Sequence, residues 1–84
     1  MNENKNLDTT LFISEDSARL EEILTLLHCT DILETFQQNH ISADRILTLK
    51  TNDFKEMHLE HRWEMIFKTN RERHRQNIQE ILER

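Results

Sequence analysis

The sequence predicts an all-α fold of five helices, the last of them long. The chain of 84 residues contains neither glycine nor proline. Glycine supplies positive φ at hairpin turns and proline fixes rigid turns, so a chain without either is poorly suited to β-hairpins. Apolar residues instead recur at helical spacing, between Ser, Thr, Asp and Asn residues that can cap helix N-termini. A chain of this length forms one small domain.

Residues 1–13 are expected to form a flexible lead-in, in which a short apolar patch at residues 11–13 lies back on the core. Ser14 is a candidate N-cap, and the two acids that follow it stand in the first turn, where they interact favourably with the helix dipole. Four apolar residues then recur at helical spacing: Leu20, Ile23, Leu24 and Leu27. A first helix is therefore predicted over residues 15–28.

Three short helices are predicted in the middle of the chain, over residues 31–39, 43–47 and 53–57. Their candidate N-caps are, in order, Thr30, Ser42 and either Thr51 or Asn52. The core is predicted to include Phe36, Ile41, Leu47, Leu49 and Ile66, with Ile41 entering it from a loop. Connections this short favour a compact bundle.

The last helix is predicted to be the longest, starting near residue 60 and running to the end of the chain. Its inward stripe consists of Trp63, Ile66, Phe67, Asn70, His74, Ile78, Ile81 and Leu82. The domain proper is expected to span residues 14–72, so that residues 73–84 extend beyond the small bundle. Apolar side chains left in water mark contact sites. We therefore expect this extension to bind a partner or a second copy through Ile78, Ile81 and Leu82.

Composition also bears on compartment and chemistry. No stretch approaches 18 apolar residues, no signal-peptide pattern is present and Cys29 is the only cysteine, which together suit a reducing, cytoplasmic compartment without direct membrane contact. The chain has no nucleophile motif, glycine-rich phosphate loop or catalytic carboxylate pair, so we expect neither an enzyme nor a small-molecule substrate. His58 and His61 are spaced to share a metal ion, but no third ligand stands at a recognisable spacing, so no cofactor is expected.

The stretch FQQNHISADRILTLKTNDFKEM, residues 36–57, resembles the middle of a sterile alpha motif (SAM) domain. That family shows a Phe, an Asn before an Ile, a Leu-Leu-x-Leu run, an Asp-Leu pair and a last helix that opens with Gly-His-Arg. The matching residues here are Phe36, Asn39, Ile41, Ile46, Leu47, Leu49, Asp53, Phe54, His61 and Arg62. The resemblance covers about residues 14–72 and implies a five-helix SAM-like bundle.

Several positions depart from the SAM pattern, mostly near the entrance to the last helix. His58 and Glu60 stand where the family has glycine, Lys50 replaces a capping Thr, and the loop before the last helix is shorter. The start of that helix is a common binding surface in the family. A SAM domain followed by a longer amphipathic helix is also similar to germ-cell proteins that combine ankyrin repeats, a SAM domain and a leucine zipper.

Charge is distributed unevenly along the chain, whose formal net charge is -5. Residues 1–60 carry five Lys or Arg against twelve acids, a net charge of -7, whereas residues 61–84 carry six against four, a net charge of +2. Such polarity favours head-to-tail association between copies. A basic surface is predicted on the last helix, at His61, Arg62, Lys68, Arg71 and Arg75. An acidic surface is predicted across the middle helices, at Glu34, Asp44, Asp53 and Glu56.

Two classes of function fit these observations. SAM domains commonly join through an end-helix surface on one copy and a mid-loop surface on another, so the resemblance implies self-association or binding to another SAM protein, as an assembly element of a larger cytoplasmic protein. A minority of SAM domains bind RNA hairpins through a basic patch around the last helix, here Arg71, Arg73, His74 and Arg75. The sequence pI of about 5.5, and the acids Glu64 and Glu72 within the basic stretch of the last helix, favour the protein-interaction module.

Overall fold

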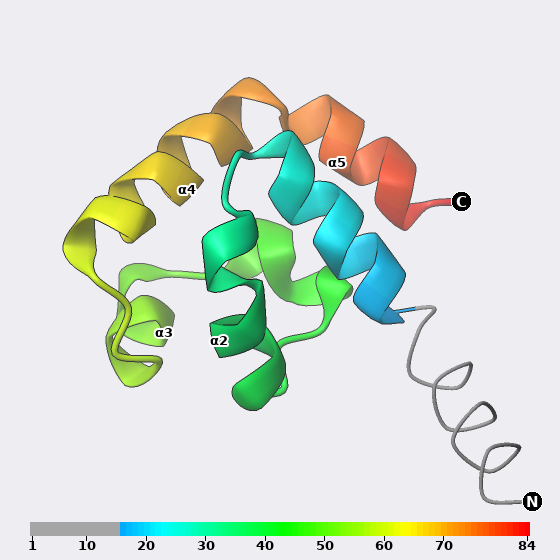
Figure 1. The fold of residues 1–84 in the computed structure, drawn as a ribbon. Coiled ribbons are helices and arrows are strands. Elements are labelled where there is room, and N and C mark those ends of the chain that lie inside the picture. Colours follow the sequence, from blue (N-terminus) through cyan, green and yellow to red (C-terminus); the bar gives the residue numbers. More distant parts are fainter. Residues whose placement is uncertain (1–15) are drawn as a thin grey trace, which may run out of the picture.

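The computed structural model describes residues 16–84 of the chain (Figure 1). The predicted lead-in, its apolar patch and the N-cap at Ser14 lie outside the described residues. Between residues 16 and 84 the chain is helical and contains no strand, so the all-α prediction is confirmed for this part. None of the helices in this part is long and apolar enough to cross a membrane.

The helices lie close to the predicted segments, except at the end of the chain. The first helix occupies residues 16–26 of the described part. It is followed by η1 (Thr30–Ile32), α2 (Leu33–Gln38), η2 (Ala43–Thr48), α3 (Thr51–Glu56), α4 (His61–Arg73) and α5 (Arg75–Leu82), where η denotes a 3-10 helix. In Figure 1, α4 and α5 form an arch over the short middle helices, and α5 lies beside the first helix.

Three phenylalanines from different helices form the centre of the core. Phe36, Phe54 and Phe67 are all fully buried. Phe67 of α4 packs against the other two, with its ring centroid 5.6 Å from that of Phe36 and 5.3 Å from that of Phe54. Ring separations in this range suit tilted and edge-to-face aromatic pairs. Phe67 therefore fixes α4 against α2 and α3.

The predicted core is correct in four positions and wrong in one. Phe36, Ile41 and Leu49 are buried, and Leu47 is partly buried against them. Ile66 is exposed instead, because α4 is rotated so that its inward stripe falls one position away from this residue. The face of α4 that meets the bundle consists of Trp63, Glu64, Phe67, Lys68, Asn70 and Arg71.

The last helix is broken at His74, and the second segment returns to the bundle. His74 has φ -113° and ψ 21°, outside the helical region, and α5 continues from it alongside the first helix. Ile78 and Ile81 are buried and Leu82 packs against the core. The prediction that these three side chains remain exposed is therefore wrong. The bend brings them onto the bundle, where each fully buried side chain contributes about 1.5–3 kcal/mol.

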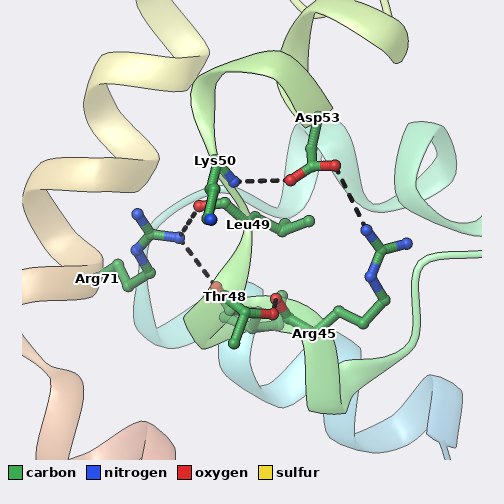
Figure 2. A network of polar contacts seen from close by, with 7 residues as sticks. Arg45, Thr48, Leu49, Lys50, Asp53 and Arg71 are labelled. Carbon is green, nitrogen blue, oxygen red and sulfur yellow. Dashed lines mark hydrogen bonds and ion pairs between the residues drawn. The ribbon is translucent and has the colours of Figure 1, made fainter.

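The N-terminus of α3 is fixed by Asp53. The N-cap is Lys50 rather than the predicted Thr51 or Asn52, and the Lys50 N–H donates to the Asp53 carboxylate over 2.8 Å. The second carboxylate oxygen of Asp53 lies 3.4 Å from a guanidinium nitrogen of Arg45 in η2 (Figure 2). A carboxylate in the first turn also interacts favourably with the helix dipole. Asp53 thus joins η2 to α3.

Three helices end at a histidine with positive φ. His28, His40 and His58 have φ values of 58°, 56° and 57°. At each of them the histidine N–H donates to the carbonyl three residues back, and the next N–H donates to the carbonyl five residues back. These paired bonds define the Schellman motif, in which glycine usually occupies the left-handed position. In this glycine-free chain, histidine takes that position three times.

Candidate functional site

Helix α4 carries most of the predicted basic surface, and it presents two different faces. Residues three, four and seven positions apart share one face of a helix. The inner face, toward the bundle, consists of Trp63, Glu64, Phe67, Lys68, Asn70 and Arg71. The outer face, toward solvent, consists of Arg62, Met65, Ile66, Thr69, Glu72 and Arg73. Positive charge is present on both faces, and the partners that each cation binds within the chain differ between them.

Arg71, assigned to the basic surface from the sequence, has its guanidinium inside the fold. Its Nη1 donates to the carbonyl oxygens of Ile46, over 3.0 Å, and Leu49, over 2.8 Å, at the end of η2 (Figure 2). Its guanidinium carbon also lies 5.4 Å from the ring centroid of Phe67. Burial lowers the pKa of Arg71, and the nearby charge of Arg75 adds to this effect. The expected exposed position is therefore wrong, and Arg71 instead holds η2 against α4.

Glu64 and Lys68 form a partly buried ion pair on the inner face. The Lys68 ammonium lies 2.8 Å from the Glu64 carboxylate and also donates to the hydroxyl of Thr51 at the start of α3. The hydrogen bond from Lys68 lowers the pKa of Glu64, and this outweighs burial, which raises it. The charge of Lys68 is thus balanced within the chain, where it helps to join α4 to α3.

The outer face of α4 leaves apolar side chains in water between two arginines. Met65 is 50% exposed and Ile66 is 36% exposed, and among residues 16–84 these are the exposed large hydrophobic residues. Arg62 and Arg73 precede and follow them, and neither forms an ion pair with another described residue. The guanidinium of Arg62 instead lies 5.3 Å from the ring centroid of Trp63. Exposed apolar groups flanked by cations suit contact with a partner that carries acids.

The other two residues assigned to the basic surface are exposed. His61 Nδ1 lies 3.9 Å from a Glu64 oxygen, at the start of α4. Arg75 pairs with Glu72 over 2.9 Å, and this pair is open to solvent. The hydrogen bond from Arg75 lowers the pKa of Glu72. Within residues 16–84, no three side chains of the kinds that bind metals gather into a possible site around His61 or elsewhere.

The four acids assigned to the acidic surface also divide into two groups. Glu34, Asp44 and Glu56 are exposed and form no ion pair with another described residue, although Glu34 accepts a hydrogen bond from Gln38. Asp53, in contrast, accepts a hydrogen bond from the Lys50 N–H at the N-terminus of α3 and pairs with Arg45 (Figure 2). The three available acids lie on α2, η2 and α3, one on each helix.

The exposed apolar pair on α4 was missed because Ile66 is hydrophobic and also fits the inward stripe by spacing, three residues after Trp63 and four before Asn70. The same spacing also places Ile66 on one face with Arg62, four residues before it, and Arg73, seven residues after it. Spacing alone therefore does not separate the two faces of α4, and tertiary packing decides between them.

Comparison of the chain with protein-family models, curated proteins and solved structures finds no significant match.

Proposed function

We propose that the chain is a protein-interaction module of the SAM type. In this proposal it associates with a second copy of itself or with another SAM domain, as an assembly element of a larger cytoplasmic protein. The contact surface on one copy is the outer face of α4. The observation that carries the proposal is the exposed pair Met65 and Ile66, set between Arg62 and Arg73.

The order and burial of the helices support a SAM-like arrangement. A first helix, three short helical segments and a long final helix follow one another, if η1 and α2 count as one helix and α4 and α5 as the last. Residues that carry the resemblance, among them Phe36, Ile41 and Phe54, are buried. His58 stands in place of a glycine and adopts the positive φ that glycine would supply.

Energetics favours the outer face over the exposed ion pairs as a contact. Fully burying a large aliphatic side chain gains about 1.5–3 kcal/mol, whereas a surface ion pair gains about 0–1 kcal/mol. Met65 and Ile66 therefore supply the affinity, in proportion to the area they still expose. Arg62 and Arg73 supply orientation and selectivity, because charges at the rim of an interface steer encounter and reject like-charged partners.

The exposed acids of the middle helices are the complementary surface on the other copy. Glu34, Asp44 and Glu56 form no ion pair with another described residue, and neither do Arg62 and Arg73 of the outer face. Two different surfaces on one molecule give a heterologous contact, which extends into open chains of copies or ends on a different SAM domain.

RNA binding has less support from the described residues. Of the side chains proposed to contact an RNA hairpin, Arg71 donates to backbone carbonyls inside the fold and Arg75 is paired with Glu72. A domain that binds nucleic acid through phosphates needs several unpaired cations on one surface. Arg73 and His74 remain, and two side chains do not make such a surface.

Two surface variants test the proposal when they are mixed. Ile66→Glu alters the outer face of α4, and a double substitution of Asp44→Lys and Glu56→Lys alters the acidic surface. Each variant alone should stay monomeric at concentrations at which the unmodified chain associates. An equimolar mixture should form a one-to-one dimer, because each partner retains one intact surface.

Sedimentation velocity measures these masses, and Gln79→Glu, an exposed change on α5, serves as the control. A mixture that stays monomeric, while the unmodified chain associates, would reject the heterologous contact. Binding of the unmodified chain to an RNA hairpin at physiological salt, with no self-association, would favour the other class of function.

A further inference from the structure

We propose that the chain can also form a domain-swapped dimer, in which α5 leaves its own bundle and packs on the first helix of a second copy. The proposal rests on the one-residue break at His74 and on the contacts that α5 makes. It does not depend on the outer face of α4, so its success or failure is separate from that of the proposed function.

The break between α4 and α5 lies in a sequence that has no helix breaker. Residues 70–78 contain neither glycine nor proline. Helical hydrogen bonds are present on both sides of the break, since the His74 N–H donates to the Asn70 carbonyl and the Ile78 N–H donates to the His74 carbonyl, each over 2.9 Å. Sharp bends in helices usually have a local cause such as proline or glycine. No glycine or proline stands here, and the bend buries Ile78 and Ile81, so we attribute it to the packing of α5 and infer that the same residues are able to form one straight helix.

The contacts of α5 with the first helix are of a kind that a second copy can reproduce. Ile78 and Ile81 are buried in the core. Arg84 pairs with Glu22 over 2.9 Å, and Arg19 donates to the Arg84 carbonyl over 3.3 Å. In a swapped dimer each of these contacts forms between two chains instead of within one, so none of them is lost.

A second copy of the chain is the partner that covers the first helix when α5 leaves it, because leaving both surfaces uncovered is costly. A monomer with α5 extended would place Ile78 and Ile81 in water and would uncover the apolar side of the first helix. A two-fold dimer of straightened chains covers both surfaces. It also adds helical hydrogen bonds at the hinge, His74, of each chain. The entropy lost on association opposes dimer formation, so protein concentration sets the balance between the two forms.

Two substitutions at the hinge change this balance in opposite directions. His74→Ala favours a continuous helix, and His74→Gly disfavours one; the His74 side chain makes no hydrogen bond to another described residue. The difference in helix propensity between alanine and glycine corresponds to roughly fivefold per hinge, and each dimer contains two hinges. The dimerisation constant of the alanine variant should therefore exceed that of the glycine variant roughly thirtyfold, as measured by sedimentation equilibrium.

A charge exchange distinguishes a swapped dimer from any other dimer. Glu22→Arg and Arg84→Glu each place like charges at the contact when α5 packs on its own chain. In a swapped dimer formed from one chain of each variant, both contacts again join an arginine to a glutamate. Glu22 and Arg84 have substantially exposed side chains, so neither variant should unfold the bundle.

The measurement uses an equimolar mixture of the two variants, each also carrying His74→Ala, that has been unfolded and refolded together. Native mass spectrometry then gives the share of mixed dimers. A mixture of Glu21→Arg and Lys55→Glu chains in the same background is the control, because it has the same differences in net charge at residues that form no ion pair with the described residues. A share well above that of the control is expected. An equal share in both mixtures, or monomers alone for His74→Ala at millimolar concentration, would overturn the proposal.

Discussion

The inner and outer faces of α4 contain similar residue types but use them differently. Each face combines apolar side chains with positive charge. On the inner face, Lys68 and Arg71 bind an acid and two backbone carbonyls of the same chain. On the outer face, Arg62 and Arg73 have no acidic partner among the described residues. The basic stretch of a small helical domain thus divides into cations that stabilise the fold and cations that remain available to a partner.

The largest expected effect separates two neighbours in the sequence, Phe67 and Ile66. Phe67 is fully buried between two other aromatic rings, so Phe67→Ala should lower the free energy of unfolding by about 3–5 kcal/mol. Ile66→Ala should lower it by less than about 1 kcal/mol, because Ile66 is already partly in water. Urea unfolding of both variants gives the comparison. Equal losses would mean that the two faces are not distinct.

Arg71 gives the next largest effect, although it is a charged residue. Arg71→Met keeps much of the side-chain volume but leaves the carbonyls of Ile46 and Leu49 without their donor. The loss should be about 2–4 kcal/mol, since each hydrogen bond from a charged group is worth about 1.5–3 kcal/mol and the two are not fully additive. Arg73→Met, on the outer face, is the matched control and should unfold at nearly the same urea concentration as the unmodified chain. A stable Arg71→Met variant would contradict the role given to this residue.

The ion pair of the inner face predicts a dependence on pH. The pKa of Glu64 is lowered in the folded state, so its contribution to stability is complete above the pKa of the unfolded chain and is lost as the pH falls through the folded pKa. Glu64→Gln removes this contribution and should cost about 1 kcal/mol at pH 7.

The difference in unfolding free energy between Glu64→Gln and the unmodified chain should therefore shrink between pH 7 and pH 3. Glu72→Gln provides the comparison in a solvent-exposed pair, where the change should be smaller. A constant difference across this pH range for Glu64→Gln would show that its pairing with Lys68 does not stabilise the fold.

The smallest effect on stability is expected at His58, in the turn before α4. Its φ of 57° suits glycine better than any residue with a Cβ atom. His58→Gly should raise the free energy of unfolding by up to about 1 kcal/mol and leave the outer face of α4 unchanged. His58→Ala, which keeps a Cβ atom, should give no such gain. A loss of association in His58→Gly would place this turn within the contact surface.

Apolar periodicity was enough to predict the helical class and most of the helix positions. Leu20, Ile23 and Phe36 are buried as expected. The break at His74 was not predictable in this way, because residues 70–78 contain neither glycine nor proline and the apolar spacing continues across it. Neither was the burial of Arg71, because a hydrogen bond to a backbone carbonyl depends on tertiary structure and leaves no pattern in the sequence.

The histidine C-caps, in contrast, left a signal that was overlooked. An apolar residue, three residues of any type, a histidine and a second apolar residue occur in LTLLHC, FQQNHI and FKEMHL. The two apolar residues of each stretch are the positions that meet in a Schellman motif. In a chain without glycine, a histidine just after a helical stretch is therefore a candidate for the left-handed position.

The most direct test of the account is the mass of the Ile66→Glu variant across a concentration series, measured together with its urea unfolding. We expect the unmodified chain to grow beyond the mass of a dimer as its concentration rises and Ile66→Glu to form nothing larger than the swapped dimer, with an unfolding midpoint close to that of the unmodified chain. That combination would show that the outer face of α4 binds a partner and does not stabilise the fold. A variant that still associates as the unmodified chain does, or that loses stability like Phe67→Ala, would contradict the division of α4 into two faces.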